Sequence, residues 1–377
     1  MKIVYVIRAD YLTQLGGDSI QMMKTKEYME KMRTDLEIEI CNHLDIKEAV
    51  ENADIVHIFN LQTIEFSYTI YQLCQKYNCI VFLSPIFWDL KDSLITSGFY
   101  TFFNLKPQKW MKVGNNIIWK LLIHLPQFNQ RIGIFGKEWG KAKEILENVD
   151  GILPNSYEEL EQICRIFKLD YEDMSSKSNI IPNAIEKDSK DIKNPENARL
   201  PSNYVLQVGR IGTVKNQIKV LQALKKKKEI PIVFIGKPEN RKYYNMCRKL
   251  AHKRGNVFFI ESVPHNEMDW YYQNAICHVN PSFRESPGLA SMEALYNGLP
   301  IVTSDEKYCP CKFYRFNEIA YLCEPYSTNS IKKAILKAMD NSGKQIVLKD
   351  YFNFFSYQTV AKMTLDAYKK CLDQRKQ

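Results

Sequence analysis

The sequence alternates short apolar runs with helix-like stretches along nearly its whole length, and it does so in two series. The first half contains five apolar runs typical of strands, at residues 2–7, 36–41, 53–59, 79–83 and 151–154. The second half contains six more, at residues 204–208, 230–235, 257–261, 276–280, 301–304 and 319–323. Strands that alternate with helices predict parallel sheets covered by helices on both faces. We therefore expect an α/β protein with two Rossmann-like, doubly wound domains.

A charged segment at residues 186–198, almost without apolar side chains, separates the two series. This composition is typical of a linker. We place the first domain at residues 1–190 and the second at residues 191–355, which suits a chain of 377 residues. Residues 356–372 have apolar positions at a helical period and predict a last helix that could pack on either domain.

Composition limits where the chain can reside. With 45% hydrophobic and 25% charged residues it is expected to be globular. No run approaches the roughly 20 apolar residues that cross a bilayer, and the N-terminus does not resemble a secretory signal. The ten cysteines lie mostly in apolar surroundings, which predicts reduced thiols in a cytoplasmic compartment.

Cys309 and Cys311 form the only close pair of cysteines. A zinc site needs further ligands at suitable spacing, and the nearest candidate, Cys323, has no histidine close in sequence. We therefore predict no metal site.

The formal net charge of +9 is compatible with three kinds of partner: nucleic acid, an anionic membrane surface or a phosphorylated substrate. Lysines cluster at residues 225–228 and recur between residues 106 and 120. Neither stretch resembles a nucleic-acid-binding module, with aromatics on adjacent strands or a recognition helix. Nucleic acid is therefore not expected as a partner.

Charged residues and glycines follow several of the predicted strands, and ligands of open parallel sheets bind beyond the carboxyl ends of the strands. Gly16 and Gly17 follow the first strand, Arg210 and Lys215 follow the first strand of the second half, and Glu285 follows its fourth. Arg210 and Lys215 are candidates to neutralise a diphosphate and to stabilise the charge that develops as it leaves. The alternative is that both are surface residues.

Glu285 and Glu293 bracket the start of a predicted helix at residues 287–297. The free amides at Gly288 and Leu289 favour a phosphate there. The two carboxylates suit sugar hydroxyls instead, because a carboxylate accepts paired hydrogen bonds from a diol. The alternative is that Glu285 caps a loop and Glu293 is a solvated helix residue.

Residues 208–215, 181–185 and above all 281–302 resemble glycosyltransferase family 4. Its members are retaining, nucleotide-sugar-dependent enzymes of the GT-B fold, in which two Rossmann-like domains face each other across a cleft. The resemblance extends to Gly16 and Gly17 and to residues 54–57 and 150–156, and it is most specific in the second half.

The resemblance implies a role for each matched residue. Glu285 would contact the transferred sugar, Glu293 the ribose, and Arg210 and Lys215 the diphosphate. The donor site would be completed by the loop at Gly16 and Gly17 and by the amides of Gly288 and Leu289. It further implies that no metal or other cofactor is needed, since the two cations replace magnesium, and that residues 356–377 pack back on the first domain.

One position departs from the family. Where many members have a histidine before an aspartate, this chain has Trp88 before Asp89. Tryptophan cannot exchange a proton but can stack on a sugar. We assign His57, Trp88 and Asp89 to the acceptor side; for His57 the alternative is a satisfied interior residue.

The resemblance predicts a retaining glycosyltransferase that moves a sugar from a nucleotide-diphosphate donor to a glycan or lipid-linked saccharide, in surface polysaccharide or glycoconjugate biosynthesis. Two alternatives stay open: a nucleotide-sugar epimerase or hydrolase of similar fold, and a binding protein with impaired catalysis.

Residues 99–135 mix aromatics with cations. They predict either a contact with anionic headgroups at the inner face of the cytoplasmic membrane or core helices around a substrate loop. The base, the sugar and the acceptor are not indicated.

Overall fold

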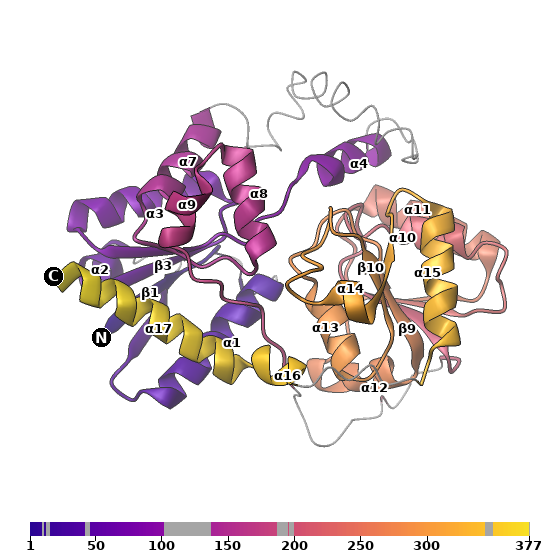
Figure 1. Ribbon diagram of the computed structural model, residues 1–377. Coiled ribbons are helices and arrows are strands. Elements are labelled where there is room, and N and C mark those ends of the chain that lie inside the picture. The colour runs from indigo at the N-terminus through magenta and orange to yellow at the C-terminus, as the bar shows by residue number, and fades with distance from the viewer. Residues whose placement is uncertain are drawn as a thin grey trace. The chain divides into compact units, whose positions relative to one another are not determined.

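The computed structural model describes residues 1–9, 11–12, 16–41, 46–101, 137–186, 195, 200–343 and 350–376. The chain divides into two compact units, each built around one parallel sheet (Figure 1). The first unit holds residues 1–88, 129–186 and 350–377, and the second holds residues 89–128 and 187–349. The predicted α/β class with two doubly wound sheets is confirmed. The range of the first unit ends at residue 186 before the long second range begins at residue 187, and the boundary expected at residues 190 and 191 stays a prediction.

The first sheet has the strand order β2-β1-β3-β4-β5, with every pair parallel. Its strands are β1 (Lys2–Val6), β2 (Glu37–Cys41), β3 (Ile55–Phe59), β4 (Ile80–Ser84) and β5 (Gly151–Ile152). The helices are α1 (Gly17–Met32), α2 (Ile46–Glu51), α3 (Ile64–Tyr77), α7 (Lys137–Asn148), α8 (Tyr157–Phe167) and α9 (Tyr171–Ser176). The central strands β1 and β3 are apolar almost throughout because helices cover both faces of the sheet.

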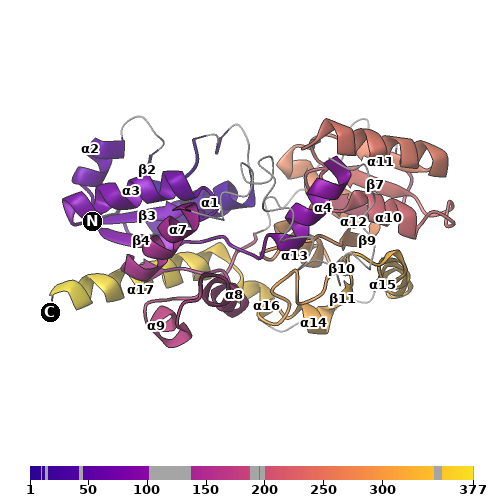
Figure 2. The ribbon, with the colours of Figure 1, turned by 90° about the horizontal axis from the view of Figure 1, so that it is seen from above.

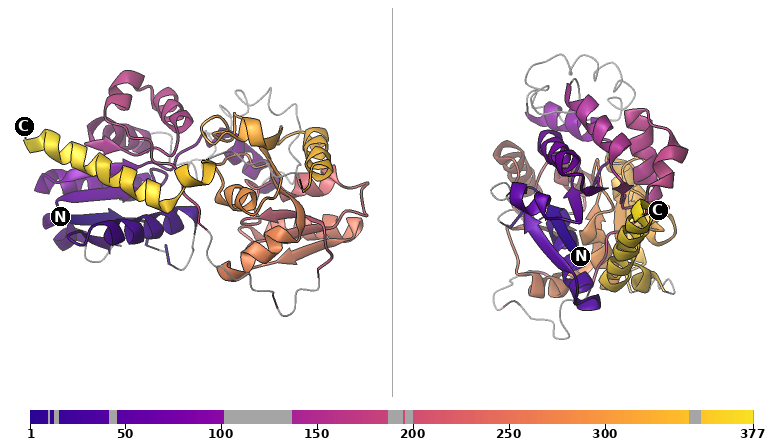
Figure 3. Two further views of the ribbon diagram at one scale, coloured as in Figure 1. Left: turned by 60° about the horizontal axis from the view of Figure 1, so that its bottom comes forward. Right: turned by 90° about the vertical axis from the view of Figure 1, so that its left-hand side faces the viewer.

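The end of the chain returns to the first unit. It forms α16 (Tyr351–Phe354) and α17 (Tyr357–Lys376), and α17 packs beside α1 (Figure 3). Val360, Ala361 and Tyr368 of α17 enter the same core as Ile3 and Tyr5 of β1. The apolar positions predicted within residues 356–372 thus form the buried face of α17.

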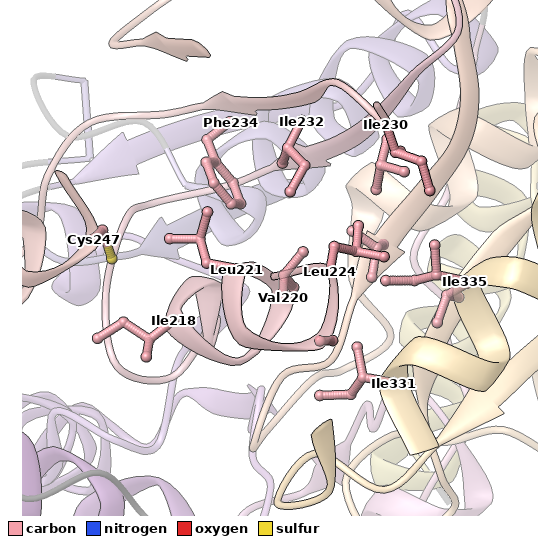
Figure 4. Close-up of a cluster of buried hydrophobic side chains, with 14 of the residues drawn as sticks. Ile218, Val220, Leu221, Leu224, Ile230, Ile232, Phe234, Cys247, Ile331 and Ile335 are labelled. Atoms are coloured by element: carbon pink, nitrogen blue, oxygen red, sulfur yellow. The ribbon is translucent and has the colours of Figure 1, made fainter. Parts of the chain in front are cut away.

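The second sheet has the strand order β11-β10-β9-β6-β7-β8, and it too is parallel. Its strands are β6 (Tyr204–Val208), β7 (Ile232–Ile235), β8 (Val257–Ile260), β9 (Ala275–Asn280), β10 (Ile301–Ser304) and β11 (Ala320–Cys323). The helices are α10 (Gln217–Ala223), α11 (Arg241–Arg254), α12 (Met268–Gln273), α13 (Leu289–Tyr296), α14 (Phe316–Ile319) and α15 (Thr328–Asp340), with a 3-10 turn η1 (His265–Glu267). Figure 4 shows the core that α10, β7 and α15 share.

Helix α4 (Lys91–Thr101) belongs to the second unit although it follows β4 of the first (Figure 2). Its Tyr100 is 1% exposed and packs edge-on against Tyr243 of α11, with ring centroids 5.1 Å apart. Its Asp92 accepts a hydrogen bond of 2.7 Å from the Tyr326 hydroxyl and pairs with Lys307. Most of the aromatic and cationic stretch of residues 99–135 lies outside the described residues. No helix within the described ranges is long and apolar enough to cross a membrane.

Candidate functional site

The candidate site lies at the carboxyl ends of β6 and β9, which are neighbours in the second sheet. The chain runs from β6 to β7 and β8 on one side, then returns to β9 and continues to β10 and β11 on the other. The loops after β6 and β9 therefore lead in opposite directions. This reversal of strand order is where ligands of open parallel sheets bind.

Buried hydrogen bonds hold these two loops together. The Asn216 side-chain amide donates to the carbonyls of Pro281 at 3.0 Å and Pro325 at 2.9 Å. The backbone amide of Phe283 donates to the carbonyl of Val214 at 2.9 Å. The residues that follow β6 thus have a fixed position against those that follow β9.

Lys215 and Glu285 form an ion pair in which Nζ lies 2.5 Å from Oε1. The side chains are 24% and 6% exposed, so the carboxylate is buried and the ammonium group is partly open to solvent. Gly209 leaves room for this pair: a Cβ there would lie 3.3 Å from Lys215 Cε, and its φ of +138° favours glycine. The structure therefore brings together the two predicted residues that are 70 positions apart in sequence.

The loop from Glu285 to Gly288 leads directly into α13. Gly288 has a φ of +96°, and a Cβ on it would lie 2.9 Å from Glu285 Oε2. The Glu285 amide donates to the Tyr308 carbonyl at 2.8 Å, and Cys309 Sγ donates to the Pro287 carbonyl at 3.4 Å. The Glu285 carboxylate is thus packed against the start of the helix at Leu289, whose first amides point beyond its N-terminus.

Glu293 lies in α13 and accepts a hydrogen bond of 2.7 Å from the Tyr272 hydroxyl to Oε2. Tyr272 is 1% exposed, and burial, together with the nearby Glu293 carboxylate, raises its pKa well above the ordinary value. The hydroxyl therefore stays protonated and donates to Glu293, which fixes the orientation of that carboxylate.

Replacing Tyr272 with phenylalanine is expected to weaken binding of a nucleoside diphosphate about fivefold, the effect of one hydrogen bond of about 1 kcal/mol. The turnover number for sugar transfer should be unchanged, since Glu293 is predicted to hold the ribose rather than the reacting sugar. Isothermal titration and steady-state kinetics measure the two effects. Tyr244→Phe, in a tyrosine of the same unit that packs on Phe259, is the control and should change neither. Equal affinities for Tyr272→Phe and the parent would contradict the assignment.

Arg210 also follows β6, but its side chain is 72% exposed and contacts Glu239 rather than Glu285. Arg210 Nη1 lies 3.7 Å from Glu239 Oε1. The Glu239 side chain fits there because residue 212 is glycine: a Cβ at Gly212 would lie 2.1 Å from Glu239 Oε2. Arg210 is therefore at the predicted edge of the sheet without being part of the Lys215–Glu285 pair.

Three polar residues at the same edge were not among the predicted site residues. They are Arg284, His278 and Asn280. Burial lowers the pKa of the Arg284 guanidinium. The pKa of His278 is lowered to about 3, mainly by burial and to a smaller extent by the positive charge of Lys215. Asn280 Nδ2 is buried, has no hydrogen-bond partner among the described residues, and lies 3.1 Å from the Cβ position at Gly288. Asn280 was detectable in the sequence as a polar residue that ends an apolar strand.

The predicted glycine loop lies in the first unit. Gly16 caps α1 and Gly17 is its first residue. A Cβ on Gly16 would lie 2.5 Å from Asp18 Oδ1, and Asp18 pairs with Arg8 at 3.1 Å. These residues follow β1, the strand at which the order of the first sheet reverses. Their role towards a donor stays a prediction.

His57 has the position of a satisfied interior residue. Its ring is 2% exposed, with Nδ1 2.6 Å from the Tyr368 hydroxyl and Nε2 2.9 Å from Ser84 Oγ. Burial lowers the pKa of His57 to about 3, so the ring is neutral at pH 7. Both nitrogens thus have partners within the first unit, which fits the alternative of an interior residue. The acceptor-side assignment of His57 stays a prediction.

Trp88 and Asp89 stand just before α4. Trp88 is 2% exposed, and Asp89 accepts a hydrogen bond of 2.9 Å from the Lys91 amide. Stacking on a sugar would require an uncovered indole face. The acceptor-side assignment of both residues stays a prediction.

In the part of the chain that the structure describes, no group of three or more His, Cys, Asp or Glu side chains could hold a metal ion.

Comparison with known proteins relates this geometry to a family. Residues 188–351 match the family model "Glycosyl transferases group 1". The chain is similar to a sucrose-phosphate synthase from Thermosynechococcus elongatus, with 17% identity, 99% of each chain covered and a TM-score of 0.70. It is similar to a glycosyltransferase from Rickettsia africae, with 14% identity, 98% of each chain covered and a TM-score of 0.65.

A third solved structure of similar fold is a putative UDP-N-acetylglucosamine 2-epimerase from Listeria monocytogenes. It has 12% identity and a TM-score of 0.57, and the alignment covers 99% of this chain and 97% of that one. No curated protein matches the chain. The similarity over the whole length confirms the predicted GT-B class of fold.

Proposed function

We propose that this chain, whose residues 188–351 match the model of glycosyl transferases group 1, is a retaining glycosyltransferase. It transfers a sugar from a nucleoside-diphosphate donor to a glycan or lipid-linked saccharide of a surface polysaccharide or glycoconjugate. The main support is the position of Lys215, Glu285 and the helix start at Gly288, which meet at the carboxyl ends of β6 and β9.

Each of these groups suits one part of such a donor. Lys215 and, after it leaves Glu239, Arg210 supply positive charge to the diphosphate, and the amides at Gly288 and Leu289 supply hydrogen bonds. Two cations at this position can stabilise the leaving diphosphate without a metal ion, so we expect transfer in the presence of a chelator. Glu285 accepts hydrogen bonds from sugar hydroxyls, and Glu293 accepts them from the ribose.

In the proposed reaction, the bond between the anomeric carbon and the donor phosphate breaks while the acceptor oxygen bonds to the same face of that carbon. The acceptor proton passes to the departing phosphate oxygen, and the products are the glycoside and a nucleoside diphosphate. Because the phosphate takes the proton, no protein side chain is needed as general base. The buried and neutral His57 is compatible with this scheme.

Glu285→Gln is expected to lower sugar transfer about 100-fold, because an amide replaces the acceptor of the sugar hydroxyl bonds. Binding of the nucleoside diphosphate should be unchanged or tighter, since Lys215 then has no carboxylate competing for its charge. Radiolabelled transfer and calorimetric titration measure the two effects. Glu306→Gln, an exposed glutamate of the same unit, is the control and should behave as the parent. Full transfer by Glu285→Gln would refute its assignment to the sugar.

The structural similarity to the putative epimerase supports a second candidate function, which is turnover of a nucleotide sugar without an acceptor. Incubation with a panel of uridine, guanosine and adenosine diphosphate sugars, with and without saccharide acceptors, separates the two activities. Transfer requires the acceptor, whereas epimerisation or hydrolysis does not. A thermal-shift screen of the three nucleoside diphosphates would identify the base, because a saturating ligand at about 100 times its Kd adds roughly 2.7 kcal/mol of stability.

A further inference from the structure

The exposed face of α11 is basic along its whole length. It presents Arg241, Lys242, Asn245, Arg248, Lys249, His252 and Lys253, and the helix contains no acidic residue. These positions recur every three or four residues and so lie on one side of the helix. Figure 2 shows α11 on the outside of the second unit.

The opposite face of α11 is anchored in the core. Tyr243, Cys247 and Ala251 pack among the buried side chains of α10 and β7. Phe259 of β8 stacks edge-on against Tyr244 with ring centroids 5.6 Å apart, and the Arg248 guanidinium lies over the Phe259 ring at 5.3 Å. The basic face thus has a fixed orientation on a rigid element.

A buried arginine holds the four consecutive lysines of residues 225–228 beside the end of this helix. Arg254 is 4% exposed and donates to the carbonyls of Leu224 at 3.1 Å, Lys227 at 2.6 Å and Ile230 at 2.6 Å. Three of the lysines, Lys225, Lys226 and Lys228, are exposed. The lysine turn is therefore held beside the last turn of α11, where His252 and Lys253 are exposed.

The two segments that carry these cations contain few acidic residues. Glu229 is the only acidic residue in residues 217–230 and 241–254, and it pairs with Lys227 at 3.6 Å. Cations in the last turn of α11 are favoured by the helix dipole, but Arg241 and Lys242 in the first turn are disfavoured by it. Stability of the helix therefore does not account for the whole basic face.

We propose that the surface made by Lys225, Lys226, Lys228 and the exposed cations of α11 binds the anionic lipid headgroups of a membrane. A bilayer rich in anionic lipid presents a dense layer of phosphate charge, and each Lys or Arg near it strengthens partitioning roughly fivefold. Among the described residues, none of the exposed large hydrophobic side chains lies on this surface, so it offers no platform for stacking bases. The preference for a membrane over a nucleic acid also rests on the proposed function, because a lipid-linked acceptor is found at such a membrane.

Sedimentation of the full chain with phosphatidylglycerol-rich vesicles and with phosphatidylcholine vesicles, at low and high salt, tests the proposal. The parent is expected to bind the anionic vesicles at low salt and to be released by high salt, because exposed charges are screened. A variant with Lys225, Lys226, Lys228, Arg248 and Lys249 changed to Gln should bind at least about 20-fold more weakly, since the loss of two contacts alone has that effect.

The matched control removes five other exposed or half-exposed cations: Lys312, Lys333, Lys337, Lys362 and Lys369, also changed to Gln. It has the same formal charge as the first variant and should bind like the parent. The proposal would be overturned if both variants lost vesicle binding equally or if the parent did not bind anionic vesicles. It would also be overturned if the parent bound neutral and anionic vesicles equally. Tighter binding of the parent to a labelled duplex oligonucleotide than to anionic vesicles would overturn it as well. Transfer to a water-soluble acceptor should be unaffected in both variants, so failure to bind vesicles and failure of the proposed glycosyltransferase activity are observed separately.

Discussion

Replacing Lys215 with glutamine is expected to lower the rate of sugar transfer by about 100- to 1000-fold, the usual effect of removing one group that stabilises transition-state charge. The leaving diphosphate gains negative charge as its bond to the sugar breaks, so the loss should appear mainly in the turnover number. Steady-state kinetics with the identified donor measures it. Lys312→Gln, a cation of the same unit that is 69% exposed, is the control and should retain the parent rate.

The same change should also destabilise the fold, because Glu285 would be left buried without its partner. Breaking a pair of this kind costs roughly 3 kcal/mol, and denaturant unfolding measures that loss. The double variant Lys215→Gln with Glu285→Gln removes the unpaired charge, so it should regain most of the stability and none of the activity. If the double variant regained activity, or if Lys215→Gln alone transferred sugar at the parent rate, Lys215 would have no role towards the phosphate.

Gly288→Ala is expected to lower sugar transfer about 100-fold, the effect of displacing a catalytic group by about 1 Å. The added methyl group would lie 2.9 Å from Glu285 Oε2 and 3.1 Å from Asn280 Nδ2. Glu285 cannot move aside freely, because it is buried and paired with Lys215. Transfer assays on the folded variant, with circular dichroism to verify its helix content, check this expectation.

Gly298 provides a control for the backbone effect at Gly288. It ends the same helix with a φ of +74°, but a Cβ there would meet no atom within 4 Å. Gly298→Ala should lose about 1 to 2 kcal/mol of stability, since a side chain is unfavourable in this left-handed conformation, and Gly288→Ala should lose at least as much because its methyl group also meets Glu285 and Asn280. Only Gly288→Ala should lose transfer activity. Equal activities in the two variants would mean that the space beside Glu285 is unimportant for catalysis.

The fold followed closely from the sequence because buried parallel strands are apolar runs of characteristic length. β6 was predicted at its observed residues, and β1 extends over residues 2–6 of the expected 2–7. The helix after Glu285 was expected from residue 287 and begins at Leu289, since Gly288 has a left-handed conformation outside the helix. Such local features depend on residues close in sequence, which is why a pattern can reveal them.

Contacts between distant residues were less predictable. The pairing of Lys215 with Glu285 requires β9 to lie beside β6, and alternation of strands and helices does not determine strand order. His57 is satisfied by Tyr368, which is 311 positions away in α17. The hydrogen-bond partners of His57 therefore depend on where α17 packs. The spacing of the apolar residues in that helix did not determine which domain it packs on.

Helix α4 limits how the chain can be divided for separate expression. A fragment that began at residue 187 would contain every strand of the second sheet but would lack Tyr100 and Asp92. Tyr243 and Cys247 would lose a buried neighbour, and Lys307 and Tyr326 would lose their carboxylate. Lys307 precedes Tyr308, whose carbonyl holds the Glu285 amide. An autonomous donor-binding fragment would therefore need residues 89–101 supplied as a separate peptide or fused ahead of residue 187.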